Sequence, residues 1–234
     1  MPVNEFHRRV AAIALGVAAD FGFALGGGNA LIAHGIIDRL TEDVDLFTND
    51  EAGVVAAADG VEAALRDAGL RPERQDKTAG LADIFPGMGD GLAEWIVAAP
   101  SGERMMLQMA YFDRCRSPVI MDIGAILDLE DVLGGKICAL ASRAYERDYA
   151  DTAAALDHYS VDQLIGLARR LDPGLTDMDF ADAGRRLDSL SDKRFIAYGL
   201  SPQDVAELRQ RFAAWPRVAP QRRPTRVAER EAEK

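Results

Sequence analysis

The chain has 234 residues, of which 48% are hydrophobic and 28% are charged, and its formal net charge is −11. These proportions suit a globular protein with one domain and an appendage, or with two small domains. The acidic balance argues against a broadly basic nucleic-acid-binding surface, so any contact with RNA would need a local cluster of basic side chains. Two cysteines, Cys115 and Cys138, lack the spacing of a metal site or a disulfide framework, which favours reduced thiols in the cytoplasm.

An apolar stripe at helical spacing marks the N-terminal segment. Phe6, Val10, Ile13 and Val17 fall on one face of a predicted helix. Basic residues before this run imitate a signal peptide, but the run is interrupted by Asp20 and has no polar spacer after it. We therefore expect an amphipathic helix that packs on a sheet. No apolar run approaches the length of a membrane span, so we expect no membrane partner.

A glycine-rich turn follows this helix. The apolar run Phe21–Leu25 predicts a buried strand, and the glycines at 26–28 separate it from a helical segment that begins at Asn29. Such a turn can offer backbone N–H groups to phosphate. The spacing matches neither a dinucleotide-binding nor a Walker-type motif, and the glycines taken alone fit a simple tight turn equally well.

Two carboxylates alternate with apolar residues between Thr41 and Phe47. Residues two apart on a strand point to the same side, about 6–7 Å from each other, so Asp43 and Asp45 share one face. Cations between two such like charges would relieve their repulsion. An isolated pair of this kind is more often a solvated strand face. The order of strand, glycine turn, helix and paired carboxylates nevertheless favours a site that transfers a nucleotide.

The middle of the chain alternates between one helix and several short strands. A helix is predicted over 51–68, the polar segment 71–78 fits an exposed strand or a loop, and strand candidates follow at 81–86, 92–99 and 104–111. The next predicted helix, Leu129–Arg143, carries Lys136 inside its apolar stripe. An unpaired buried ammonium is costly, so Lys136 must either extend to solvent or meet an anion.

The last part of the chain is predicted to be helical. Helices are expected over 161–171, 177–190 and 202–214, with Ser160 and Ser201 as N-caps, and they carry no evident catalytic constellation. The segment Arg217–Lys234 holds six basic residues against three glutamates and little apolar content. This composition predicts a disordered basic tail.

Two blocks of the sequence together resemble the AbiEii-type nucleotidyltransferase toxins. That family includes the mycobacterial MenT toxins and belongs to the polymerase-β-like nucleotidyltransferase superfamily. The first block is Gly27-Gly28-Asn29-Ala30-Leu31 with Arg39-x-Thr41-x-Asp43-x-Asp45-Leu46-Phe47, and the second runs from Leu129 through Lys136 to Asp151. Family members usually carry Thr or Ser at the position of Asn29.

The resemblance implies an α/β fold, in which a polymerase-β-like core of mixed sheet and flanking helices precedes a helical C-terminal domain. The expected division is 1–125 for the nucleotidyltransferase core, 126–216 for the helical domain and 217–234 for the basic tail. Polymerase-β-like enzymes often place a third metal carboxylate on a later strand. Gln108 stands there in this chain, and Asp113 is a weak substitute, so the site is expected to rest on two aspartates.

The resemblance also implies roles for individual residues. Asp43 and Asp45 would be catalytic and would bind Mg²⁺, or Mn²⁺ in its place. Lys136 would hold the triphosphate, and Asp148 would be the later catalytic aspartate, with Asp151 as its rival. The implied nucleotide-binding set is Gly27, Gly28, Asn29, Arg39, Thr41 and Lys136. For Asp151, the alternative role is a surface ion pair with Arg143 or Arg147.

The implied function is metal-dependent transfer of a nucleoside monophosphate from an NTP to an acceptor hydroxyl. The first candidate acceptor is tRNA, and the protein would arrest growth as the toxin partner of a co-encoded antitoxin. Two alternatives stay open: a small-molecule nucleotidyltransferase of the antibiotic-modifying kind, and a catalytically silent interaction protein with this fold. Retention of Asp43, Asp45 and Lys136 favours an enzyme, because a silent protein would not need that charge cluster.

Overall fold

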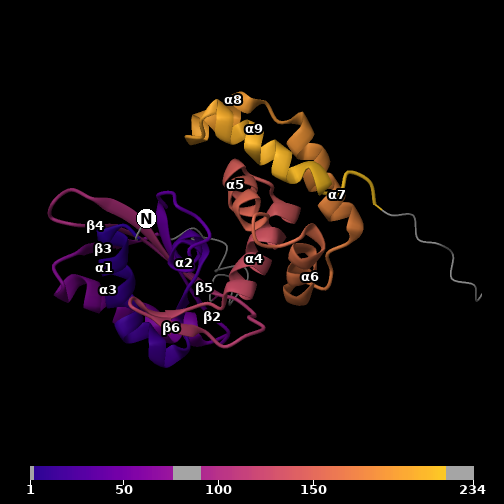
Figure 1. The fold of residues 1–234 in the computed structure, drawn as a ribbon. Coiled ribbons are helices and arrows are strands. Elements are labelled where there is room, and N and C mark those ends of the chain that lie inside the picture. The colour runs from indigo at the N-terminus through magenta and orange to yellow at the C-terminus, as the bar shows by residue number, and fades with distance from the viewer. Residues whose placement is uncertain (1–2, 76–90, 220–234) are drawn as a thin grey trace, which may run out of the picture.

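The computed structural model describes residues 3–75 and 91–219. Within these ranges a seven-stranded mixed sheet is followed by a group of helices (Figure 1). The helices are α1 (Glu5–Ala18), α2 (Gly27–Ala33), α3 (Gly53–Asp67), α4 (Leu129–Ser142), α5 (Glu146–Ala155), α6 (Val161–Leu171), α7 (Asp177–Ser189), α8 (Asp192–Tyr198) and α9 (Pro202–Arg211). The strands are β1 (Ala24–Leu25), β2 (Asp43–Thr48), β3 (Arg71–Arg74), β4 (Leu92–Ala98), β5 (Arg104–Tyr111), β6 (Val119–Met121) and β7 (Gly124–Ile126).

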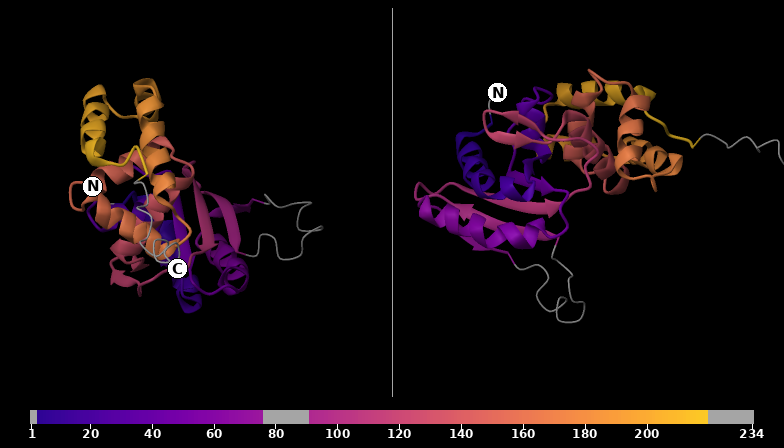
Figure 2. Two further views of the ribbon diagram at one scale, coloured as in Figure 1. Left: turned by 90° about the vertical axis from the view of Figure 1, so that its right-hand side faces the viewer. Right: turned by 90° about the horizontal axis from the view of Figure 1, so that it is seen from below.

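The sheet has the order β3-β4-β5-β2-β1-β7-β6. Strand β2 pairs in parallel with β5 and antiparallel with β1, while β1 pairs in parallel with β7. Helices α1 and α3 pack against each other and against the sheet, whereas α4 to α9 form the separate helical group seen in Figure 2. The α/β class and the helical C-terminal region predicted from the sequence are therefore confirmed.

Local sequence explains how the first helix forms and where it packs. The Asn4 side chain accepts hydrogen bonds from the backbone N–H groups of Phe6 and His7, which caps α1. Phe6 and Val10 on its predicted apolar face are buried, and Ile13 and Val17 are partly buried against the same core. The predicted amphipathic helix is thus confirmed.

The helical group is held by an aromatic core. The Tyr149 ring packs edge-on against Phe195 and Phe212, and Phe212 in turn packs against Trp215. The Tyr149 hydroxyl donates to the Ala183 carbonyl at 2.7 Å, so the polar group of this buried ring is satisfied. The predicted N-caps are also confirmed, because Ser160 and Ser201 each accept a hydrogen bond from the third residue of the following helix.

Several predicted boundaries differ from the structure. Only Ala24–Leu25 of the predicted strand 21–25 is extended, because Ala19–Phe21 forms a 3-10 turn that Gly22 ends with a left-handed conformation. The hairpin of β6 and β7 and the helix α8 were not predicted. The strand candidate at 81–86 lies outside the described residues, as does the tail from residue 220 onward. No helix in the described ranges is long and apolar enough to cross a membrane.

Arg217, the first residue of the predicted basic tail, contacts the helical group. Its guanidinium pairs with Asp188 at 2.9 Å and donates to the carbonyls of Phe212 and Trp215.

Candidate active site

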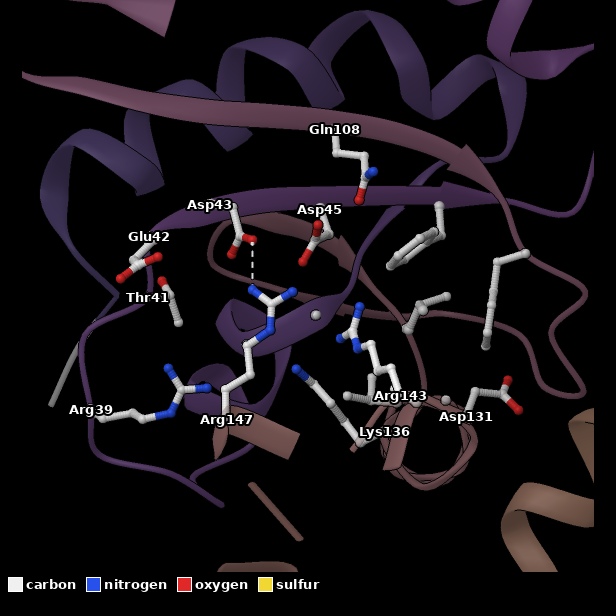
Figure 3. A pocket seen from close by; sticks show the side chains of 18 of the residues that line it. Arg39, Thr41, Glu42, Asp43, Asp45, Gln108, Asp131, Lys136, Arg143 and Arg147 are labelled. Atoms are coloured by element: carbon white, nitrogen blue, oxygen red, sulfur yellow. Dashed lines mark ion pairs between the residues drawn. The ribbon is translucent and has the colours of Figure 1, made fainter. Parts of the chain in front are cut away.

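A cavity of about 290 Å³ lies between the sheet and the helices α4, α5 and α8 (Figure 3). It collects most of the predicted site residues from segments far apart in the sequence. Those that line it are Gly27, Gly28, Arg39, Thr41, Asp43, Asp45 and Lys136. Asn29 and Asp148 are not among the described residues that line it, and both lie behind its wall.

The paired carboxylates lie on the face of β2 that turns toward this cavity. Val44 and Leu46 between them are fully buried on the opposite face, as the alternation predicts. Burial and the neighbouring Asp43 carboxylate raise the pKa of Asp45 to about 7, against the opposing effect of Lys136 and nearby arginines. The surroundings of Asp45 thus disfavour its negative charge, and a bound cation would stabilise that charge.

The glycine turn packs directly against these carboxylates. Gly27 has a left-handed φ of 58°, and a Cβ atom there would lie 1.8 Å from Asp45 Oδ2. A Cβ atom at Gly28 would lie 2.6 Å from Thr41 Cγ2. Both glycines are therefore required for the close approach of the turn to β2, and not only for the turn itself.

A buried hydrogen-bond chain connects helix α1 to the start of β2. The Asn29 amide nitrogen donates to the Asp43 carbonyl at 2.6 Å, and the Thr41 hydroxyl donates to Asn29 Oδ1 at 2.8 Å. The Thr41 hydroxyl has a single proton and donates it to Asn29. His7 Nδ1, which lies 3.2 Å from Thr41 Oγ1, must therefore be the donor of that contact. Burial lowers the pKa of His7, which favours its neutral form. Asn29 and the Thr41 hydroxyl therefore hold the backbone at the start of β2 in place.

Lys136 pairs with a buried anion, which is one of the two outcomes that the sequence allowed. Its ammonium lies 2.8 Å from Asp151 Oδ2, while Arg39 donates twice to Asp151 Oδ1, at 3.0 and 2.6 Å. The Asp151 side chain is fully buried. The alternative of a surface ion pair with Arg143 or Arg147 was wrong, because the partners of Asp151 come from the sheet side and from α4. Asp151 thereby holds two cations of the cavity wall.

Asp148 has a different set of partners. Arg143 donates to both of its carboxylate oxygens at 3.0 Å, and the Tyr145 backbone N–H donates to Oδ2 at 3.0 Å. Its side chain is fully buried. These contacts cap the start of α5 and orient Arg143, which itself lines the cavity.

The sequence did not single out several residues that line the cavity. Phe47 and Phe112 line one part of it, and Glu42 and Tyr198 line another. Tyr198 ends α8, far along the chain, and its ring lies under the Arg39 guanidinium at 5.9 Å. Phe47 stands two residues after Asp45 on a predicted strand, so its shared face with the carboxylates could have been inferred. Nothing in the local sequence of α8 marks Tyr198.

The donor set can be compared with the needs of a divalent cation. Asp43 and Asp45 supply carboxylate oxygens, which suit Mg²⁺ or Mn²⁺. Gln108 pairs with Asp45 across β2 and β5, and its amide donates to Glu94 at 3.1 Å. No group of three or more His, Cys, Asp or Glu residues is arranged to hold a metal ion in the described ranges. Asp43 and Asp45 are therefore the two carboxylates that would hold such a cation.

The mixed sheet with its glycine turn and paired aspartates defines the class of a nucleotidyltransferase. A family described as nucleotidyl transferase AbiEii toxin of type IV toxin–antitoxin systems matches residues 17–213. The chain belongs to this AbiEii toxin family, and the family implies an NTP substrate and a cognate antitoxin.

Solved structures support the fold. The chain is similar to JHP933 from Helicobacter pylori, with 16% identity, a TM-score of 0.56 and coverage of 89% of this chain and 91% of that one. It is also similar to a putative nucleotidyltransferase from H. pylori, at 16% identity, a TM-score of 0.56 and coverage of 88% and 90%. MenT4, a nucleotidyltransferase toxin from Mycobacterium tuberculosis, gives 13% identity, a TM-score of 0.52 and coverage of 89% and 82%. No curated protein matches the chain.

Proposed function

We propose that this nucleotidyltransferase transfers a nucleoside monophosphate from an NTP to a hydroxyl of tRNA in the cytoplasm, and that this reaction is its toxic activity. The observation that carries the proposal is the convergence of Lys136, Arg143 and Arg147 on the two carboxylates of β2. Phosphoryl transfer depends mainly on positioning and on charge stabilisation, which such an arrangement provides. The proposed division into a core at 1–125 and a helical domain at 126–216 places the cavity at their junction.

Asp43 and Asp45 would hold Mg²⁺, or Mn²⁺ in its place. When bound, the cation would polarise the α-phosphate and neutralise charge on the leaving pyrophosphate. Lys136 and the turn at Gly27 and Gly28 would hold the β- and γ-phosphates. The ammonium of Lys136 has three donors and Asp151 engages one side of it, so it can also bind a phosphate oxygen.

The nature of the acceptor follows from charge. Arg39 and Arg147 border the Asp43 side of the cavity, which Glu42 also lines, and Arg39 is paired with Asp151 whereas the contact of Arg147 with Asp43 is long, at 3.8 Å (Figure 3). Arginines bind phosphates well, whereas a cationic aminoalcohol drug would be repelled by them. The charges therefore support a nucleic-acid acceptor over a small-molecule one.

The decisive experiment incubates the purified protein with each α-labelled NTP and either total RNA or aminoalcohol antibiotics, with and without Mg²⁺. Label in tRNA would support the proposal. Label confined to the antibiotics would establish the small-molecule alternative, and label in neither would favour a silent interaction protein. The double variant Asp43→Asn/Asp45→Asn is the control, and full activity in it would remove the metal assignment.

A further inference from the structure

The cavity has two chemically different ends, and the carboxylates lie between them. The Asp43 side carries Arg39, Glu42 and Arg147, while the far side of Asp45 is lined by Phe47, Phe112, Leu127, Val132, Gly135 and Ala139. Figure 3 shows Arg39, Glu42 and Arg147 at the left and Asp131 at the right, with Asp43 and Asp45 between them. A reaction with two substrates can use both ends, with the transferred phosphate in the middle.

Two aromatic rings form one wall of the apolar end. The Phe47 and Phe112 ring centroids are 5.4 Å apart with the planes tilted by 44°, and both rings are only partly buried. The backbone fixes them in place, because Phe112 N–H donates to the Thr48 carbonyl at 2.7 Å. A Cβ atom at Gly26 would lie 2.3 Å from the Phe47 ring, so the first glycine of the turn makes room for that ring.

Helix α4 lies close to this aromatic wall because it carries a glycine there. A Cβ atom at Gly135 would lie 3.4 Å from Phe112 Cε2, which is ordinary contact distance. The neighbouring Gly134 instead faces α6, where a Cβ atom would lie 3.0 Å from the Leu167 carbonyl oxygen. Gly134 thus serves helix packing, whereas Gly135 lines the cavity at a point where one added methyl group would reach the Phe112 ring.

The carboxylate at this end is already engaged. Asp131 accepts from the backbone N–H groups of Cys115 and Arg116, at 3.1 and 2.8 Å, through separate oxygens. Its side chain therefore fixes the loop that follows Phe112. What remains toward the cavity is a slot of aromatic and aliphatic surface, which suits a flat, uncharged ring.

We propose that this apolar end is the nucleobase subsite for the NTP, and that its size, which Gly135 and Phe112 limit at the cavity wall, selects the base. The inference rests on the proposed function and extends it to base selection. Phe47 follows Asp45 on the same strand face, so a nucleotide with its α-phosphate at Asp45 can place its base beside Phe47. The acceptor then approaches from the charged end.

The test compares Gly135→Ala with Gly166→Ala. Both place alanine in a helix, but Gly166 on α6 has nothing within 4 Å of its Cβ position and lies away from the cavity. Affinity for ATP, GTP, CTP and UTP is measured by equilibrium titration, separately from transfer. We expect Gly135→Ala to weaken purine binding relative to pyrimidine binding by about tenfold, as one added methyl does in an apolar pocket. Gly166→Ala should match the wild type.

Two further measurements complete the test. Phe112→Ala should weaken binding of all four NTPs by about tenfold or more, since base stacking is lost, and should leave the acceptor KM unchanged. ATP and inosine triphosphate, which differ at the base edge, should bind the wild type within about threefold of each other, because size and not the edge is selected. Unchanged NTP preference in Gly135→Ala, or an effect on the acceptor KM alone, would overturn the subsite. Size-dependent NTP binding without transfer to any acceptor would support the subsite and overturn the proposed function.

Discussion

Asp45 shows how strongly the surroundings of a single residue shape this site. Its carboxylate is buried beside a second carboxylate, and a cation of α4 and two arginines near α5 offset part of the cost. The raised pKa means that the metal-free folded protein binds a proton that the unfolded chain releases. Stability and the proposed metal binding are consequently linked through this one group.

Between about pH 4 and pH 7, the folded state holds more protons than the unfolded state, because the pKa of Asp45 rises from 3.8 to about 7. The contribution of Asp45 to stability is therefore greatest near pH 4, falls as the pH rises to about 7, and is then constant. We expect Asp45→Asn to lack this part of the pH dependence. Urea unfolding from pH 4.5 to 8 in the presence of a chelator measures it, and parallel curves for wild type and variant would contradict the assignment.

Asp148 and Asp151 can be distinguished by what their partners do. Asp151 holds two cations of the cavity lining, Arg39 and Lys136, whereas Asp148 caps α5 and holds one, Arg143. Loss of either buried charge should lower stability by about 3 kcal/mol, since a cation loses its partner. Asp151→Asn should also lower kcat about 100-fold, because misplaced phosphate-binding groups slow transfer. In Asp148→Asn, kcat should stay within about tenfold of wild type. Equal losses of kcat in the two variants would contradict this division.

At the scale of elements, the sequence predicted those features that depend only on residues close together in the chain. The alternation in β2, the apolar face of α1 and the serine caps are local patterns, and all three were predictable. The hairpin β6–β7 was missed because its strands are very short and because β7 is placed by pairing with β1, about a hundred residues earlier in the chain. The bridge from Arg39 to Asp151 spans 112 positions and arises from tertiary packing alone.

Helix α1 reaches the active site through the chain that begins at His7. Residue 7 lies outside the segment that matches the family, yet its ring donates to Thr41, which is joined through Asn29 to the Asp43 carbonyl. We expect His7→Leu to lower the unfolding free energy by about 1 kcal/mol, the net worth of one buried hydrogen bond, and to lower kcat. His7→Asn places an amide donor near Nδ1 and should restore both. Chemical unfolding and steady-state kinetics of the two variants provide the check, and equal behaviour would argue against the hydrogen bond.

At the scale of the whole molecule, basic groups gather at the cavity although the net charge of the chain is negative. A net charge of −11 repels RNA at long range, so binding of the proposed tRNA acceptor would depend on basic groups gathered at the cavity. Arg143 is a poor probe of this effect, because its removal leaves the buried Asp148 without its partner. Arg147 is better suited, since its side chain is 37% exposed and its contact with Asp43 is long, at 3.8 Å.

The last prediction therefore compares Arg147→Ala with Arg66→Ala. Arg66 is an exposed arginine of α3 that pairs with Glu62 and does not line the cavity, so its removal changes the net charge equally. If Arg147 contacts a phosphate of the acceptor, its loss should weaken tRNA binding across sequences and flatten the dependence of log K on log salt by about one unit. Arg66→Ala should keep the wild-type slope, because distant exposed charges are screened. The measurement is tRNA binding without NTP from 50 to about 300 mM salt, a range over which such contacts change affinity strongly. Identical slopes for the three proteins would place the acceptor's phosphates elsewhere and return the small-molecule acceptor to first place.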